Sequence, residues 1–148
     1  MESAASDSLF AELADVLLRI SREIDPNGAR AIDIPPLTGT EALVMRWVDR
    51  NPGSTPSSVA DAIALQRSNL SVALGSLVKK GMVERRPDPE DARTVQLFST
   101  ELAKRSVEKL HTHWAGMLRQ ALGADEGDLV RTISVLTRID DGLRAAPR

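Results

Sequence analysis

The sequence of 148 residues has no cysteine and no tyrosine, and only two tryptophans and two phenylalanines. Without cysteine the chain cannot form disulfide bonds, zinc–thiolate sites or a thiol redox sensor. No apolar run approaches the ~20 residues of a membrane-spanning helix, and the acidic start MESAASDSLF lacks the basic and apolar parts of a signal peptide. These absences predict a soluble, cytoplasmic protein, and nothing in the sequence requires a cofactor.

Catalytic motifs are missing as well. The sequence contains no glycine-rich phosphate loop, no cysteine nucleophile and no Ser–His–Asp set within a recognisable motif. Hydrophobic residues make up 42% of the chain, which suffices for a packed core, and the length suits one compact protomer. We therefore expect a globular protein that is not an enzyme.

Basic residues are concentrated in one part of the chain. The segment from Gln66 to Arg105 carries eight basic and five acidic residues, whereas the whole chain has a net charge of −2. Local charge, not the total, decides whether a surface tolerates phosphate groups. The asymmetry is modest, and it gives the DNA-binding hypothesis weak support.

Amphipathic helices are predicted at both ends of the chain. Apolar residues recur at helical spacing over Asp7–Ile24, over Ser99–Gly123 and over Leu129–Leu143. The turn-forming residues Asp25–Gly28 end the first of these helices. A wide apolar face on a terminal helix predicts packing against another element, and a second subunit is a candidate.

Between these ends, three short helices are predicted. Thr38 and Glu41 fit a capping box, and Thr55 with Pro56 begins the second helix. Ser68 is the expected cap of the third helix, Asn69–Lys80. The inner face of the first is expected to carry Leu43, Val44, Trp47 and Val48, and that of the third Leu70, Ala73, Leu74 and Leu77.

A hairpin follows the third helix. Gly81 provides a left-handed stop, Met82–Arg86 and Arg93–Phe98 alternate as strands do, and Pro87–Asp91 reads as the turn between them. Two helices in tandem followed by a charged hairpin indicate a winged helix-turn-helix, which places its second helix in a DNA major groove.

At this point the chain resembles the MarR family of transcriptional regulators. The resemblance lies in LTGTEALVMRWV (37–48), SNLSVALGSLVKKGMVERR (68–86) and DPEDARTVQLFSTELAKR (88–105). Asp91-Ala92-Arg93 stands where that family has its Asp-x-Arg wing motif, and LFST replaces the Leu-Thr usual at the joint after the wing. The resemblance implies an α+β, mostly helical fold with dimerisation segments at 1–36 and 101–148 and a DNA-binding domain at 37–100.

The resemblance also implies a function. Such proteins are homodimers that bind double-stranded DNA at pseudo-palindromic operators, usually as repressors. A small-molecule effector, frequently aromatic or phenolic, often binds between the dimer helices and the winged domain and releases the DNA. The amphipathic terminal helices of this chain fit that arrangement independently.

Eleven residues are the candidates for DNA contact. They are Gln66, Arg67, Ser68, Asn69, Ser71, Val72, Lys79, Arg85, Arg86, Asp91 and Arg93. Arg93 is expected to reach the minor groove or a phosphate while Asp91 holds it; a solvated hairpin salt bridge is the alternative. Val72 and Ser76 occupy turns where many relatives carry Arg or Lys, so Val72 could touch a thymine methyl group and Asn69 or Gln66 an adenine.

The candidates for ligand binding are fewer. Arg19 and Arg46 could meet a carboxylate, and Trp47 and Trp114 could line a pocket or simply fill the core. Two further functional hypotheses stay open. One is a winged domain that binds protein instead of DNA. The other is a metal-responsive regulator that uses Glu108 and His111, which lie three residues apart on a helix.

Overall fold

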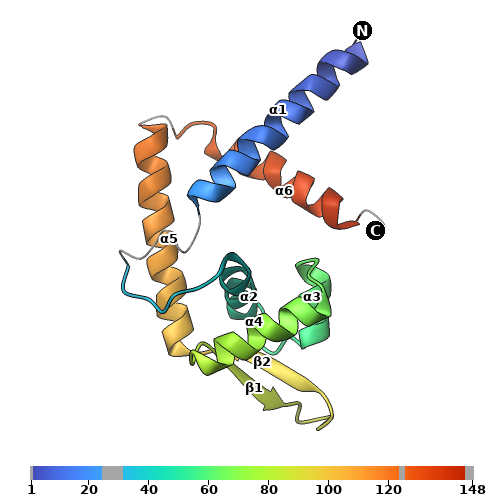
Figure 1. Ribbon diagram of the computed structural model, residues 1–148, viewed down its shortest axis with the longest axis vertical. Coiled ribbons are helices and arrows are strands. Elements are labelled where there is room, and N and C mark those ends of the chain that lie inside the picture. Colours follow the sequence, from blue (N-terminus) through green and yellow to red (C-terminus); the bar gives the residue numbers. More distant parts are fainter. Residues whose placement is uncertain (1, 25–31, 124–125, 146–148) are drawn as a thin grey trace.

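The structure, a computed structural model, describes residues 2–24, 32–123 and 126–145. Within them, six helices and one antiparallel sheet of two strands form an α+β, mostly helical fold, as predicted (Figure 1). The elements are α1 (Glu2–Glu23), α2 (Gly39–Arg50), α3 (Pro56–Ala62), α4 (Arg67–Lys79), β1 (Val83–Pro87), β2 (Val95–Ser99), α5 (Glu101–Leu122) and α6 (Leu129–Ala145). The predicted turn Asp25–Gly28 lies outside the described residues.

The molecule has two parts that α5 connects (Figure 1). Helices α2, α3 and α4 and the hairpin β1–β2 form the lower part, and α5 rises from the hairpin to the upper part, where α1 and α6 cross. The first turns of α5 belong to the lower core, because Ala103, Ser106, Val107 and Leu110 are buried. The first turns of α5 therefore pack in the core of the lower part, and its other end reaches the upper part.

The core lies under α2, α4 and the hairpin. The predicted inner face of the third helix is confirmed, since Leu70, Ala73, Leu74 and Leu77 are all buried in α4. On α2 the prediction is confirmed for Val44 and Val48, which are fully buried, and Trp47 is partly buried against the core. It was wrong for Leu43, which is 38% exposed, and it missed Met45, which is fully buried.

Two helix starts differ from the predictions. The first helix begins at Glu2 rather than Asp7. Helix α4 begins at Arg67, because Gln66 is the last extended residue, with φ −62° and ψ 139°. Ser68 is therefore inside the helix and is not its cap, and Gln66 makes no capping hydrogen bond through its side chain. The caps at Thr38 and Thr55 and the left-handed Gly81, with φ 71°, are confirmed.

A buried carboxylate joins the start of α2 to the end of α4. Glu41 Oε2 accepts the backbone N–H of Thr38 at 3.0 Å and Lys80 Nζ at 2.7 Å, and Lys80 Nζ also donates to the carbonyl of Pro36 at 2.7 Å. Burial raises the pKa of Glu41, but hydrogen bonds from Lys80, Ser76 and Thr38 outweigh it and hold the pKa below its usual value. The carboxylate therefore stabilises the fold in its charged form.

We expect Glu41→Gln to lower the free energy of unfolding by about 2 kcal/mol at neutral pH, because it leaves the half-buried Lys80 without its counter-charge. The difference from the wild type should be complete above ~pH 4.3 and should shrink as the pH falls below it, since the folded pKa is the lower one. Urea unfolding at several pH values measures this. Glu101→Gln, in an exposed pair with Lys104, is the control and should stay close to the wild type. Equal effects of the two substitutions would contradict a structural role for Glu41.

Candidate nucleic-acid interface

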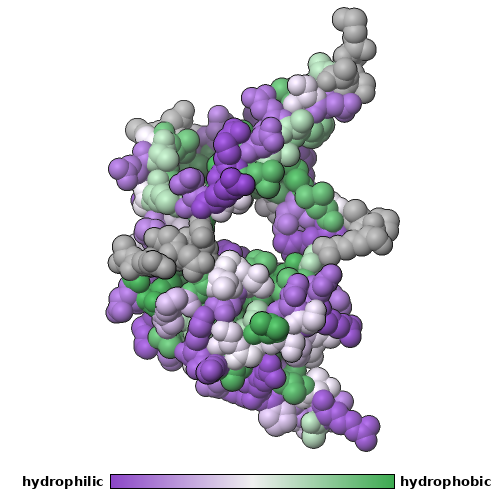
Figure 2. All heavy atoms as spheres, in the orientation of Figure 1, coloured by the Kyte–Doolittle hydropathy of each residue, from purple (hydrophilic) through white to green (hydrophobic). Residues whose placement is uncertain are grey.

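The outward face of α4 has small, uncharged residues at its centre. Ser68, Asn69, Ser71, Val72 and Gly75 are exposed on it. In Figure 2 the surface over α4 is pale, the colour of intermediate hydropathy, around a small green apolar area. A helix with such small side chains can enter a groove ~12 Å wide.

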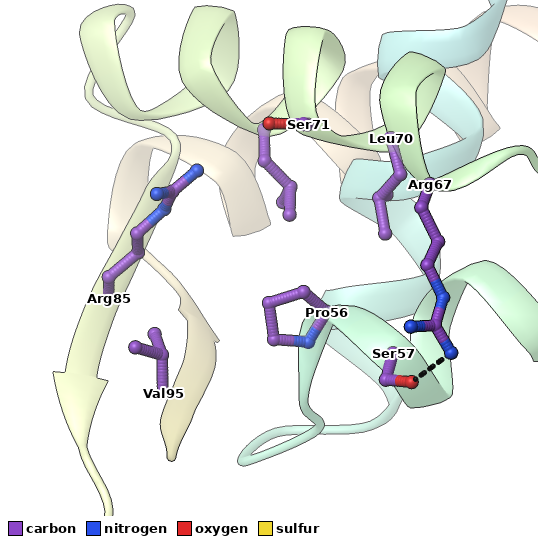
Figure 3. Close-up of a pocket in the computed structure, with 8 residues that line it drawn as sticks. Pro56, Ser57, Arg67, Leu70, Ser71, Arg85 and Val95 are labelled. Atoms are coloured by element: carbon purple, nitrogen blue, oxygen red, sulfur yellow. Dashed lines mark hydrogen bonds between the residues drawn. The ribbon is translucent and has the colours of Figure 1, made fainter. Parts of the chain in front are cut away.

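Positive charge lies at the two ends of α4. Arg67, in its first turn, donates from Nη2 to Ser57 Oγ of α3 at 3.1 Å, which fixes the guanidinium across the helix pair (Figure 3). Lys79 is exposed in the last turn, where a cation also suits the helix dipole. The centre of the face is therefore neutral and its flanks are basic.

A groove separates α4 from the hairpin. It encloses about 350 Å³ and is lined by Pro56, Ser57, Arg67, Leu70, Ser71, Leu74, Arg85 and Val95 (Figure 3). Sheet alternation brings Arg85 there, because it shares a face of β1 with the buried Val83 and pairs with Leu97 of β2. Arg85 has no hydrogen bond or ion pair to a described residue, so its guanidinium is available to an external anion.

Arg86 points to the other face of β1. It donates to Glu84 Oε2 from Nη2 at 2.7 Å and from Nε at 3.2 Å, and its guanidinium lies 4.5 Å from the ring centroid of Phe98. The two neighbouring arginines thus differ: Arg86 is paired within the hairpin and Arg85 is not.

The wing turn is built by two aspartates. Asp88 accepts the backbone N–H of Glu90 at 2.8 Å and the side-chain amide of Gln96 at 3.1 Å. Asp91 accepts the backbone N–H of Arg93 at 3.0 Å and the hydroxyl of Thr94 at 3.1 Å. The expectation that Asp91 holds the Arg93 side chain was wrong, because Asp91 fixes the backbone of Arg93 instead. The Arg93 guanidinium is exposed and has no ion pair within the described ranges.

Two residues near α4 were missed by sequence reasoning. Ser57 lines the groove and binds Arg67, a contact across ten positions that no local pattern signals. Ala64, in the turn between α3 and α4, has a φ of 53°, a left-handed value uncommon for a residue with a side chain. That turn is closed by Leu65 N–H donating to the Ala60 carbonyl at 2.9 Å, and this contact sets where α4 begins.

Two of the four ligand candidates lie together. The Arg46 guanidinium lies 5.0 Å from the ring centroid of Trp114, and Arg46 Nε donates to the Ala42 carbonyl at 3.2 Å. Burial, and then the charge of Arg50, lower the pKa of Arg46. Trp114 Nε1 is buried and has no partner among the described residues. Trp47 is half-buried against the core, while Arg19 lies apart from Arg46, in a cavity of about 400 Å³ between α1 and α5.

The metal hypothesis finds no cluster to support it. Glu108 is exposed on α5, and the ring of His111 lies 6.1 Å from that of Trp114. Burial and then Arg46 and Arg50 lower the pKa of His111, whereas Asp49 raises it. In the described ranges, no three histidine, aspartate or glutamate side chains come together as metal ligands would. No helix in the same ranges is both long and apolar enough to cross a membrane.

Comparison with known proteins agrees with this geometry. Residues 36–94 match the sequence profile of the MarR family. The structure is similar to the transcriptional regulator SlyA, with a TM-score of 0.71, 19% identity, and coverage of 91% of this chain and 94% of that one. No significant match is found among curated proteins.

Two similar structures contain DNA. One is Streptococcus pneumoniae FabT in complex with DNA, with a TM-score of 0.71, 19% identity, and coverage of 90% and 96% of the two chains. The other is the transcriptional repressor CouR bound to a 23-mer DNA duplex, with a TM-score of 0.68, 24% identity, and coverage of 86% and 91%. At these identities the likeness establishes the winged-helix fold.

We expect Asp91→Ala to loosen the wing turn without unfolding the protein. The amide hydrogen of Arg93 should exchange faster, because the substitution removes the carboxylate oxygen that accepts it. The free energy of unfolding should change by less than ~1 kcal/mol, since the turn is exposed. Hydrogen exchange followed by NMR measures both. Glu90→Ala, in the same turn, is the control. Equal exchange in the two variants would mean that Asp91 does not order the wing.

Proposed function

We propose that the chain, whose residues 36–94 match the MarR family, regulates transcription as a homodimer bound to double-stranded DNA. Residues 37–100 are the DNA-binding domain, and residues 1–36 and 101–148 form the dimer. Helix α4 enters the major groove, and the wing around Asp91 and Arg93 lies against the adjacent backbone or minor groove. The DNA complexes of FabT and CouR, which share the fold, support this arrangement.

The observation that carries the proposal is the free face shared by α4 and the wing. Ser68, Asn69, Ser71, Val72 and Gly75 are exposed on α4, and the guanidinium groups of Arg85 and Arg93 have no ion pair within the described residues. By contrast, Lys80 is neutralised by Glu41 and Arg86 by Glu84. Two unpaired arginines beside a narrow, uncharged helix suit a phosphate backbone on either side of a groove.

The dimer is proposed from the apolar surface of the upper helices. Helix α6 has no buried residue although its sequence is amphipathic. The large apolar side chains exposed on α1, α5 and α6 are Leu9, Phe10, Leu18, Ile20, Leu118, Leu122, Leu129, Val130, Ile133, Val135 and Leu143. So much apolar surface indicates a protein interface. Two-fold symmetry would place two half-sites ~34 Å apart, as in a pseudo-palindrome.

More specifically, we propose that the protein is a repressor and that a small-molecule effector releases it from DNA. Arg46 of α2 and Trp114 of α5 would receive the effector, because they lie together between these helices and each has an N–H donor without an acceptor among the described residues. The Arg46 guanidinium is partly buried beside Arg50 without a carboxylate, an arrangement that favours an anionic ligand. A protein-binding winged domain is the second candidate, which the uncharged centre of α4 favours.

Selection of DNA from a random pool by the purified protein tests the function. We expect an inverted repeat to be enriched at low and at physiological salt, and Arg93→Ala to weaken its enrichment. Sedimentation of the protein alone should give the mass of a dimer. Absence of enrichment at either salt concentration would exclude the sequence-specific regulator and favour the protein-binding module.

The salt dependence of binding to the selected DNA separates Arg85 from Arg86. Each phosphate contact adds about one unit to the slope of log K against log salt. We therefore expect Arg85→Ala to reduce the slope by roughly two units for a dimer, one per subunit. Arg86→Ala, on the opposite face of the same strand, should leave the slope unchanged. Similar reductions in both variants would contradict the assignment of Arg85 to a phosphate.

A further inference from the structure

An apolar side chain stands alone at the centre of the α4 face. Val72 is 75% exposed, the second most exposed of the large hydrophobic side chains. Its neighbours on that face, Ser68, Asn69, Ser71 and Gly75, are uncharged. A single exposed valine is ordinary on a protein surface. At the middle of a helix proposed to enter a groove, however, it is the group that the bases would meet first.

Gly75 follows Val72 by one helical turn on the same face. It has ordinary helical geometry, because the described glycines with positive φ are Gly53, Gly81 and Gly123. A Cβ added at Gly75 would meet no atom within 4 Å. Nothing within the described chain therefore requires glycine there, and glycine weakens a helix interior relative to alanine. Its effect is to leave the backbone bare beside Val72, with space for an outside group.

The surroundings restrict what that group can be. The central face has no arginine or lysine that could pair with guanine and no carboxylate that could pair with cytosine. The groups that base pairs present in the major groove are hydrogen-bond donors, acceptors and one apolar group, the 5-methyl of thymine. A valine side chain next to an open glycine matches only the methyl group in size and polarity.

We infer that Val72 and Gly75 form a binding site for the 5-methyl group of one thymine in each half-site. The inference rests on the proposed DNA binding and makes it specific. Val72 supplies the apolar contact, and Gly75 lets the base edge approach the helix. Arg67 and Lys79 lie at the ends of α4 and do not compete for this position.

Replacing single thymines by deoxyuridine in the selected DNA tests this methyl-binding site, because it removes the methyl group and keeps the base pairing. We expect one thymine per half-site to matter, with an affinity loss of about fourfold, the value of one buried methyl group. Val72→Ala should bind the thymine DNA less tightly and should no longer distinguish it from the deoxyuridine DNA. Because Val72 is exposed, its substitution should leave the fold intact.

Gly75→Ala gives a second measurement, because it should change the stability of the protein and its affinity for DNA in opposite directions. The melting temperature should rise, because alanine favours the helix, while the affinity for the selected DNA should fall. Gly39→Ala, at the start of α2 and equally free of neighbours within 4 Å, is the control; it should not weaken DNA binding.

Three outcomes would overturn the inference. The first is a selected DNA in which no deoxyuridine substitution weakens binding. The second is an equal loss in the wild type and in Val72→Ala. The third is a Gly75→Ala variant that binds as tightly as the wild type. In all three the proposed regulator survives, since it still binds a selected sequence. Failure to select any DNA would refute both the proposed regulator and the methyl-binding site that rests on it.

Discussion

The ion pair between Lys80 and Glu41 is the contact on which the placement of the other elements depends. Glu41 completes the capping box of α2, and Lys80 is the residue at which α4 ends. Their 2.7 Å bond therefore fixes the end of α4 against the start of α2. Lys80 also holds the Pro36 carbonyl, so the chain that enters the winged domain is fixed at the same point.

The wing and α5 follow from that point within a few residues. Gly81 takes its left-handed conformation directly after Lys80, and Thr100 then donates from Oγ1 to the Gly81 carbonyl at 2.7 Å and from N to the Met82 carbonyl at 3.1 Å. Thr100 is also the cap of α5. The base of the hairpin, the end of α4 and the start of α5 thus share one small polar cluster. In the proposed dimer, these few bonds would link α5 to the end of α4.

The sequence alone was sufficient to predict the structure where local residues determine it. The capping residues Thr38 and Thr55, the glycine after α4 and the alternation of the hairpin strands all depend on neighbours in the chain. They predicted the elements, although β1 is Val83–Pro87 rather than Met82–Arg86 and β2 is Val95–Ser99 rather than Arg93–Phe98. The periodicity of α4 predicted its buried residues one by one. The failures have a different cause. The start of α4 depends on the left-handed Ala64, which no turn-forming residue marks, and the Arg67–Ser57 and Arg46–Trp114 contacts depend on how separate helices pack.

The distribution of charge around α4 bears on how such a surface could select a sequence. Contacts between arginines and phosphates give affinity for any DNA, and salt weakens all of them alike. Arg85 and Arg93, which have no ion pair within the described residues, lie on the wing, one beside the groove and one at the wing tip, whereas the centre of α4 is neutral. Affinity and selectivity would then arise from different residues. Charge at the rim would hold the duplex, and a valine and a bare stretch of helix at the centre would discriminate among bases by shape and polarity. Contacts of this kind do not depend on ionic strength, so discrimination between sites should persist at salt concentrations where total affinity has fallen.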